Sequence, residues 1–328
     1  MRLNLLVPEI VLFFATCIYL LLAFIVGRPA VLGLEDALRR ISFICCYYAL
    51  SLFVVFLCAR LKSIQECRQS KTQLAFNDFS RQALRTSFSY SRILCDLRLL
   101  LVIACTFTVY VNLKDLIPLI NPNVYDQYII DLEAFVFGFP LTAALGSTLT
   151  ADSASYWSTV YTFFYSYMGL SVLIVLLHGR QQITHEFVTA FVLVWFIGIL
   201  VVYALPTLGP CFYDWPAEHL IYPSGVHDMQ EKLYRWMILL GENPFRQNAA
   251  YMISGLPSLH IAVPTLATYY LLRVNRIVGA ASILFMMLTF YAALVFEWHY
   301  VSDLLAGICL GLFCIMLARK LTKTELKV

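Results

Sequence analysis

Charged residues are scarce in this chain of 328 residues: they make up 13% of the sequence, while apolar residues make up 61%. An ordinary soluble domain carries about 25% charged residues, so the composition excludes a water-soluble fold. Segments that alternate apolar and polar residues, as membrane β-barrels require, are also lacking. In their place the sequence has continuous apolar runs of about 20 residues, the length of a helix that crosses a hydrocarbon core about 30 Å thick.

The apolar runs predict an all-α integral membrane protein with about eight transmembrane helices. No small-residue cleavage site follows the first run, so we interpret it as a retained helix and not as a signal peptide. The predicted spans are Leu5–Val26, Ile41–Leu61, Ile93–Asn112, Tyr156–Leu177, Phe187–Leu205, Leu256–Leu272, Ile277–Phe296 and Tyr300–Leu317.

Low-complexity segments, short-period repeats and C-x-x-C pairs are absent from the sequence as well. Nearly all of the 10 cysteines lie in or against predicted spans, where the thiol packs as a small apolar group. Cys211 is the only one placed in an outer loop. The sequence therefore predicts neither a disulfide framework nor a cysteine-bound metal.

The distribution of charge predicts the topology. Lysine and arginine gather in residues 62–92, after the sixth span and in the tail 319–328, whereas residues 113–155 and 206–255 are rich in acids. By the positive-inside rule, the cationic segments and both termini are cytoplasmic, and the acidic segments face the periplasm or lumen. Three arginines in the first outer loop oppose this assignment for the first pair of spans. The net charge of +3 thus reflects topology and does not indicate nucleic-acid binding.

These features divide the chain into an N-terminal transmembrane pair (1–61), a basic cytoplasmic linker (62–92), a six-helix membrane core (93–318) and a cytoplasmic tail (319–328). An interfacial amphipathic helix and a plain linker both agree with the linker sequence.

Two outer loops of the core have distinct compositions. Residues 206–255 contain five prolines, which exclude a long helix and indicate an ordered cap over the bundle. Residues 131–149 are too short and too interrupted to span a membrane. They predict a short interfacial helix with Phe135, Phe137 and Phe139 facing lipid.

Polar groups at membrane depth are costly, about 2.5–3.5 kcal/mol for a central charge on insertion scales, so each one calls for a reason. One polar cluster, Gly255 to His260, lies at the outer mouth of the sixth span. Pro257 suits the first turn of a helix, whose free N–H groups and positive dipole end make an anion site beside the Ser258 hydroxyl. His260 follows in the same turn, within reach of a bound phosphate.

A second polar cluster, His299 to Asp303, lies at the outer start of the eighth span. A spacing of four places His299 and Asp303 on one helix face. Asp303 can then accept the Nδ1–H of His299, which leaves Nε2 free as a nucleophile and stabilises the cation formed on attack. Since the sixth and eighth spans both begin at the outer surface, we expect the two clusters at similar depth on the same side.

Structural roles compete with this interpretation. His260 alone can satisfy a helix end, and His299 with Asp303 can form an intramembrane pair without catalytic function. A metal site of these three residues is a further alternative, with only three ligands in sight. Because both clusters occur at one surface, the pattern favours a catalytic site. Gly307-x-x-x-Gly311 predicts close helix packing within the bundle.

The two clusters resemble the second and third signature elements of the type 2 phosphatidic acid phosphatase superfamily, whose members share a six-helix membrane core. The matching residues are Pro257-Ser258-Leu259-His260 and His299-x-x-x-Asp303. Within the superfamily the chain is most similar to the branch that contains inositol phosphorylceramide synthases, and the resemblance covers roughly residues 93–317. The stretches that carry the similarity to this branch are Asp131–Gly138, Tyr203–Pro210, and Leu259 in place of the phosphatases' glycine.

The resemblance implies an enzyme that forms a phosphohistidine. His299 would attack phosphorus, Asp303 would orient the imidazole, and His260 would protonate the leaving oxygen and later activate the acceptor. This is covalent catalysis with acid–base assistance, which needs no metal or other cofactor. The implied partners are a phospholipid donor and either a lipid alcohol or water as the acceptor; no protein partner is indicated.

Two elements of the superfamily pattern are missing. The Lys-x6-Arg-Pro element is absent after the fifth span, and Ala292-Ala293 stand where a Ser-Arg pair is expected. Such cations normally clamp a phosphoryl group that carries two charges. Their loss favours a transferase of singly charged phosphodiesters over a monoester phosphatase. The candidates for substrate binding are Ser258 at the anion site and, as substitutes for the clamp, Arg246, Lys114 and Tyr213.

Four functions stay open on the sequence: a lipid phosphotransferase, a lipid phosphate phosphatase that uses water, a non-enzymatic transporter, and an inactive scaffold of the same fold. Transporters of this length often show paired halves with broken helices in matching positions. No such symmetry is visible, and the polar residues gather at one face without crossing the bilayer.

Overall fold

The computed structural model describes residues 5–29, 38, 42, 46, 48–53, 90–178, 180–213, 222–245, 251 and 253–323. All regular elements in these ranges are helices, as the sequence predicts. They are α1 (Val7–Ile25), α4 (Tyr90–Lys114), α5 (Ile117–Ile120), α6 (Asp126–Phe137), α7 (Leu141–Gly146), α8 (Ala151–Thr162), α9 (Phe164–His178), α10 (Gln181–Ala204), α11 (Pro210–Tyr213), α12 (Gly225–Glu242), α13 (Leu259–Val274), α14 (Arg276–Val295) and α15 (Val301–Thr322).

Six segments in the described ranges are long and apolar enough to cross a membrane, so the predicted count of eight is not confirmed. The predicted second span, Ile41–Leu61, and the linker 62–92 lie largely outside the described residues. The predicted sixth span corresponds to α13, whose 16 residues give a length of about 24 Å, less than a hydrocarbon core. The six segments are Val7–Ile25, Ser91–Ile120, Ala151–His178, Gln181–Ala204, Arg276–Val295 and Val301–Thr322.

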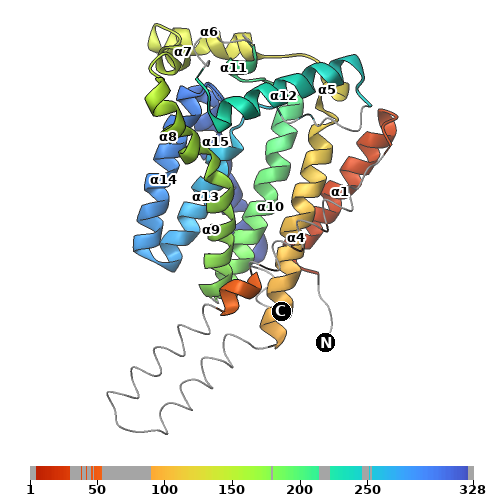
Figure 1. The fold of residues 1–328 in the computed structure, drawn as a ribbon. Coiled ribbons are helices and arrows are strands. Elements are labelled where there is room, and N and C mark those ends of the chain that lie inside the picture. The colour runs from red at the N-terminus through yellow and green to blue at the C-terminus, as the bar shows by residue number, and fades with distance from the viewer. Residues whose placement is uncertain are drawn as a thin grey trace.

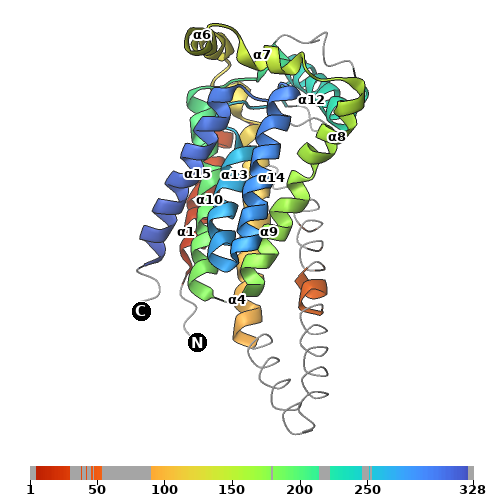
Figure 2. The ribbon, with the colours of Figure 1, turned by 90° about the vertical axis from the view of Figure 1, so that its left-hand side faces the viewer.

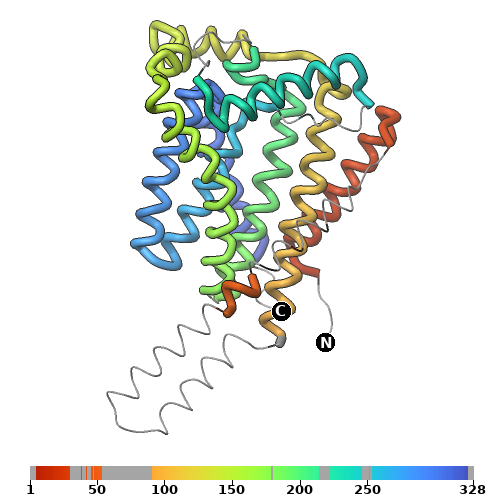
Figure 3. Tube along the Cα trace, in the orientation of Figure 1, coloured from red at the N-terminus to blue at the C-terminus, as the bar shows by residue number. Residues whose placement is uncertain are grey.

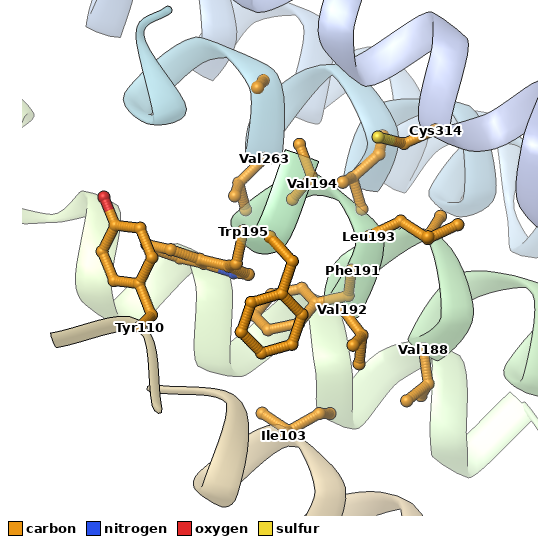
Figure 4. Packing of buried hydrophobic residues seen from close by; sticks show 14 of the residues in the cluster. Ile103, Tyr110, Val188, Phe191, Val192, Leu193, Val194, Trp195, Val263 and Cys314 are labelled. Atoms are coloured by element: carbon orange, nitrogen blue, oxygen red, sulfur yellow. The ribbon is translucent and has the colours of Figure 1, made fainter. Parts of the chain in front are cut away.

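Helix α10 lies at the centre of the bundle. It packs against α1, α4, α9, α13 and α15, and α13 packs in turn against α9, α14 and α15 (Figure 1, Figure 2). A helix with neighbours on most sides needs an apolar surface all round, and buried residues occur on every face of α10. Figure 4 shows this packing around Phe191 and Trp195.

Helices α13 and α15 approach each other closely because α15 has glycine at the contact. A Cβ atom on Gly307 would collide with the Ser258 carbonyl, and one on Gly311 would lie 2.8 Å from the Ala262 carbonyl oxygen. The prediction that these glycines pack within the bundle is confirmed. The contact holds the first turns of α13 and α15 side by side, which brings the two polar clusters together.

Helices α6, α7, α11 and α12 lie across the end of the bundle at which α13 and α15 begin, called the site end below (Figure 1, Figure 3). The prediction that prolines exclude a long helix in residues 206–255 is wrong, since α12 contains 18 residues. Its flanking prolines lie outside the helix: Pro223 precedes the N-cap residue Ser224, and Pro244 follows the C-cap residue. Proline is tolerated there because no intrahelical hydrogen bond is lost.

Helix α6 is the short helix predicted in the outer loop between the third and fourth predicted spans, although it begins earlier than expected, at Asp126. It ends at Gly138, whose φ of 77° is readily adopted by glycine. One face carries the buried acids Asp126 and Glu133, while Phe135 on the other is 88% exposed. The contact of this exposed face with lipid stays a prediction.

Candidate active site

The first polar cluster forms the beginning of α13. The helix begins at Leu259 with Ser258 as its N-cap residue. Pro257 therefore precedes the helix, and the prediction that it lies in the first turn is wrong. The Ser258 N–H donates to the Asp303 carbonyl at 2.9 Å and is therefore not available to an anion. The Ser258 hydroxyl is buried and has no hydrogen-bond partner among the described residues. His260 lies in the first turn, as predicted.

The second polar cluster forms the turn between α14 and α15. Helix α15 begins at Val301 after the N-cap residue Tyr300, so His299 precedes the helix. The prediction that His299 and Asp303 share a helix face is therefore wrong. The two side chains still meet, with 3.6 Å between His299 Nδ1 and Asp303 Oδ2. That distance is a contact and not a hydrogen bond. Asp303 Oδ2 instead accepts the Tyr300 N–H at 3.0 Å, which fixes the carboxylate beside the imidazole.

The two histidines face each other, with 5.8 Å between their ring centroids. Tyr161 stacks on His260 at 4.9 Å, and Phe164 packs against the same imidazole at 4.5 Å. Tyr161 also stacks on Trp298, the residue before His299, at 5.6 Å. This aromatic stack runs from one histidine to the neighbour of the other and so limits the movement of both rings.

Lys114, at the end of α4, joins the histidines at the site end. Lys114, His260 and His299 line a single cavity of about 830 Å³. The Lys114 side chain is buried, and its Nζ lies 5.7 Å from the centroid of the Tyr110 ring. Of the described residues that line the cavity, Lys114 is the only lysine or arginine. Of the three predicted substitutes for the phosphate clamp, it is the one that the structure places with the histidines.

Burial determines the charge of His299. Its side chain is almost inaccessible, and burial lowers its pKa to about 3; the Gly255 backbone opposes this shift, and Lys114 adds to it. The imidazole is therefore neutral at physiological pH. A neutral imidazole has the free lone pair that a nucleophile needs.

Tyr213, another of the predicted clamp residues, does not join this group. Tyr213 ends α11, is 37% exposed, and its hydroxyl donates to Gln127 Oε1 at 3.4 Å. It is not among the described residues that line the cavity. Arg246 lies outside the described residues. At Ala292 and Ala293, where the superfamily pattern has Ser-Arg, both side chains are fully buried in apolar packing, which leaves no space for a long cation.

Two buried acids with no predicted role hold the turn around His299. Asp126 accepts hydrogen bonds from two backbone N–H groups of the segment after α10, each at 2.8 Å, and from the Tyr300 hydroxyl at 3.1 Å. Glu133 accepts the Val301 N–H at 2.6 Å. Both acids come from one face of α6, two helical turns apart. The sequence signal that could have revealed Asp126 and Glu133 is their spacing, which places both acids on one face of a helix whose opposite face is apolar.

The segment after α10 reaches both polar clusters. The Thr207 hydroxyl accepts the Leu256 N–H and the Thr207 carbonyl accepts the Gly255 N–H, each at 2.7 Å. Gly209 has a φ of 91°, and a Cβ atom there would collide with the Trp298 carbonyl, so only glycine suits this position. This segment belongs to one of the stretches that carry the family resemblance.

The fold and the site define a helical membrane protein with paired histidines at one end of its bundle. The family model of the PAP2 superfamily matches residues 127–317, more than half of the chain. The chain belongs to this superfamily, as its two motifs indicate. Membership supports phosphatase or phosphotransferase activity on lipid-like substrates. No curated protein and no solved structure matches the chain.

Proposed function

We propose that the protein is a lipid phosphotransferase that moves a phosphate or phospho-headgroup from a phospholipid to a lipid alcohol through a phosphohistidine on His299. One observation carries this proposal: His299 and His260, from separate elements, line the same cavity as Lys114, with Asp303 behind His299. Burying this many ionisable groups costs free energy, and chemistry at the site is the reason that best accounts for that cost.

In the first step, Nε2 of His299 attacks the phosphorus of the donor. Nδ1 faces the Asp303 carboxylate, which stabilises the positive charge that develops on the ring. As the P–N bond forms, the bond from phosphorus to the leaving oxygen breaks, and His260, which enters this step as the imidazolium, donates a proton to that oxygen and becomes neutral. If the headgroup stays on phosphorus, the released alcohol is a diacylglycerol.

In the second step, the hydroxyl oxygen of the acceptor attacks the phosphohistidine. His260 takes the hydroxyl proton, the P–N bond breaks, and neutral His299 is restored. Water in place of a lipid alcohol would make the same site a phosphatase. The residues that perform the chemistry are identical in the two reactions. Whether the protein is a transferase or a hydrolase therefore depends on which acceptor, a lipid alcohol or water, reaches the phosphohistidine.

The charge of the cavity favours a phosphodiester donor. A singly charged phosphodiester is compensated by one ammonium group, whereas a monoester dianion needs a second cation in a buried site. Lys114 is the one lysine or arginine among the described lining residues, so such side chains offer at most one positive charge there. This supports a reaction like that of the inositol phosphorylceramide synthase branch, in which a phospho-inositol group is transferred.

From the distribution of lysine and arginine, we further propose that the site end faces the periplasm or lumen.

The test is incubation of purified protein with phosphatidylinositol labelled in its headgroup, with and without a ceramide or diacylglycerol acceptor, and identification of the products by mass spectrometry. We expect the label on the lipid acceptor. Label released into water as inositol phosphate, with or without the acceptor, would show that water is the acceptor and identify a hydrolase instead.

Two variants test the assigned roles. His299→Ala should lower the rate by about 10³-fold or more, and Asp303→Asn, which can still cap α15, by about 10²- to 10⁴-fold. Asp152→Asn at the exposed start of α8 is the matched control. Unchanged turnover in a well-folded His299→Ala protein would refute the phosphohistidine.

A further inference from the structure

The cavity that contains the histidines extends far beyond them. Its site end has the ionisable lining residues Lys114, His260 and His299, whereas most of the other lining residues are apolar and come chiefly from α4, α9, α10 and α12. Six of these apolar residues define its course: Leu100, Ile103 and Phe107 on α4, Leu173 on α9, and Phe191 and Trp195 on α10.

Interlocked aromatic rings form the wall that α4 and α10 contribute. The Trp195 ring lies edge-on to Phe107 at 4.9 Å and to Tyr110 at 4.7 Å, and Phe107 lies edge-on to Phe191 at 5.7 Å. Figure 4 shows Tyr110 beside Trp195. Rings packed in this way stabilise one another, so the cavity is preformed and its width is fixed.

The depth of the cavity exceeds one leaflet of a bilayer. Lys114 and Leu100 both line it, and the helix between them rises by about 21 Å. Half of a hydrocarbon core is about 15 Å. An occupant that fills the cavity from the histidines to Leu100 therefore passes the middle of the membrane.

In the part of the chain that the structure describes, the cavity also reaches the side of the bundle. Tyr165 and Leu170 on α9 line it, yet they are 55% and 47% exposed. Both lie within a segment apolar enough to span a membrane, so the opening faces the hydrocarbon core and not water. A ligand that enters there comes from the bilayer.

We propose that this cavity binds one long hydrocarbon chain of the lipid substrate, with the phosphate of that lipid at Lys114 and His299. The inference rests on the proposed function and adds to it a site that selects the chain. In a bilayer the chain exchanges apolar lipid for apolar protein, so its binding adds little affinity per methylene. The shape of the cavity instead decides which chains fit, because contacts are lost wherever the chain leaves a gap.

Gly169 on α9 offers a direct way to block the cavity. It lines the cavity, and a Cβ atom added to it would meet no other atom within 4 Å. It follows Phe164, which packs on His260, by five residues, or about 8 Å along the helix. A large side chain at this position would project into empty space without a clash in the protein and shorten the cavity. Replacing a helical glycine also tends to stabilise the helix, by up to about 1 kcal/mol.

The experiment measures kcat/KM for donors that share one headgroup but carry long or short acyl chains. For Gly169→Leu and Gly169→Phe, the ratio of the long-chain to the short-chain value should fall by about 10-fold or more relative to the wild type. Gly241→Leu is the matched control, because Gly241 on α12 also has open space around its Cβ position but does not line the cavity. Its ratio should equal that of the wild type.

A photo-crosslinking measurement separates this inference from the proposed function. A phospholipid with a diazirine near the end of its acyl chain should crosslink to α4 and α9 in the His299→Ala protein, and less in His299→Ala with Gly169→Phe. An active wild type whose chain-length ratio and crosslinks are unchanged by both Gly169 variants would overturn the chain site. Crosslinking that Gly169→Phe blocks, in a protein with no transferase or phosphatase activity, would uphold the chain site and refute the proposed function.

Discussion

The carboxylate of Glu133 accepts a hydrogen bond from the Val301 N–H at 2.6 Å, and this bond joins α6 to the first residue of α15. Thr142 adds its hydroxyl, at 2.9 Å from the same carboxylate. A negative charge at a helix N-terminus is stabilising, and in a buried position the effect is larger than at a surface. Since His299 lies just before α15, Glu133 helps to position the side chain that we propose as the nucleophile.

We predict that Glu133→Ala lowers kcat by about 10- to 100-fold with little change in KM, because a displacement of about 1 Å at the nucleophile is enough for such a loss. Glu133→Gln keeps an acceptor for the Val301 N–H and should recover much of the rate. Asp131→Ala is the control, since Asp131 is on the same helix but is exposed, and its carboxylate accepts a hydrogen bond from the neighbouring Gln127 side chain. Equal losses in kcat and in the yield of folded protein for both Glu133 variants would point to a purely structural role.

Lys114 gives a second prediction. Lys114→Met should lower kcat/KM by about 10²- to 10³-fold, the effect of removing one stabilising donor from a buried transition state. Lys114→Arg keeps the charge on a differently shaped group and should retain part of the activity. Lys232→Met is the control, because Lys232 lies over the Trp236 ring on α12 and is not among the described cavity residues. A fully active Lys114→Met enzyme would exclude this lysine as the phosphate ligand.

How far the sequence could predict this structure depends on the kind of signal. The apolar runs predicted all six of the described segments that are long and apolar enough to cross a membrane. The two histidine motifs also met as expected, because helix length and direction fix which helix ends lie together. The predicted spans begin at Leu256 and Tyr300, whereas α13 begins at Leu259 and α15 at Val301. The turns before both helices are set by long-range hydrogen bonds such as that from the Ser258 N–H to the Asp303 carbonyl.

Two larger errors have different causes. The 18 residues of α12 lie between two prolines that flank the helix, and proline density over a wide window does not reveal this. The roles of Asp126 and Glu133 depend on the docking of α6 against α15, which no local pattern encodes. The sequence named three candidates to replace the phosphate clamp. Only the fold distinguishes Lys114, which lines the cavity with the histidines, from Tyr213, which does not.

The pH dependence follows from the environment of His299. Burial lowers its pKa to about 3, so the imidazole binds a proton only at pH values far below those of a free histidine. The proposed nucleophile is therefore neutral throughout the range from about pH 5 to pH 8, in which histidine normally changes charge. We predict that kcat/KM shows no loss near pH 6.5 on the acid side. An acid limb with that midpoint, measured with a phosphodiester donor, would show that His299 titrates as an exposed imidazole does.

The last prediction concerns the side of the membrane on which the chemistry takes place. Gly225 begins α12 at the site end and is exposed, while Lys323 is exposed beyond the last turn of α15 at the opposite end. In a protein whose 10 cysteines have been replaced, we expect Gly225→Cys to react with a membrane-impermeant thiol reagent in intact cells, and Lys323→Cys to react only after the cells are opened. A cysteine at Lys71, which lies outside the described residues, should behave like the one at position 323.

The reverse labelling pattern would invert the topology and place the histidines at the cytoplasmic leaflet, where a different set of lipids is available. Labelling of both Gly225→Cys and Lys323→Cys in intact cells would mean that the two positions lie on the same side of the membrane, with an even number of spans between them. Because α13, α14 and α15 lie between these positions, that result would show that the short helix α13 does not cross the membrane. The same two cysteines thus test both the side of the site and the one helix of the core that is shorter than a bilayer.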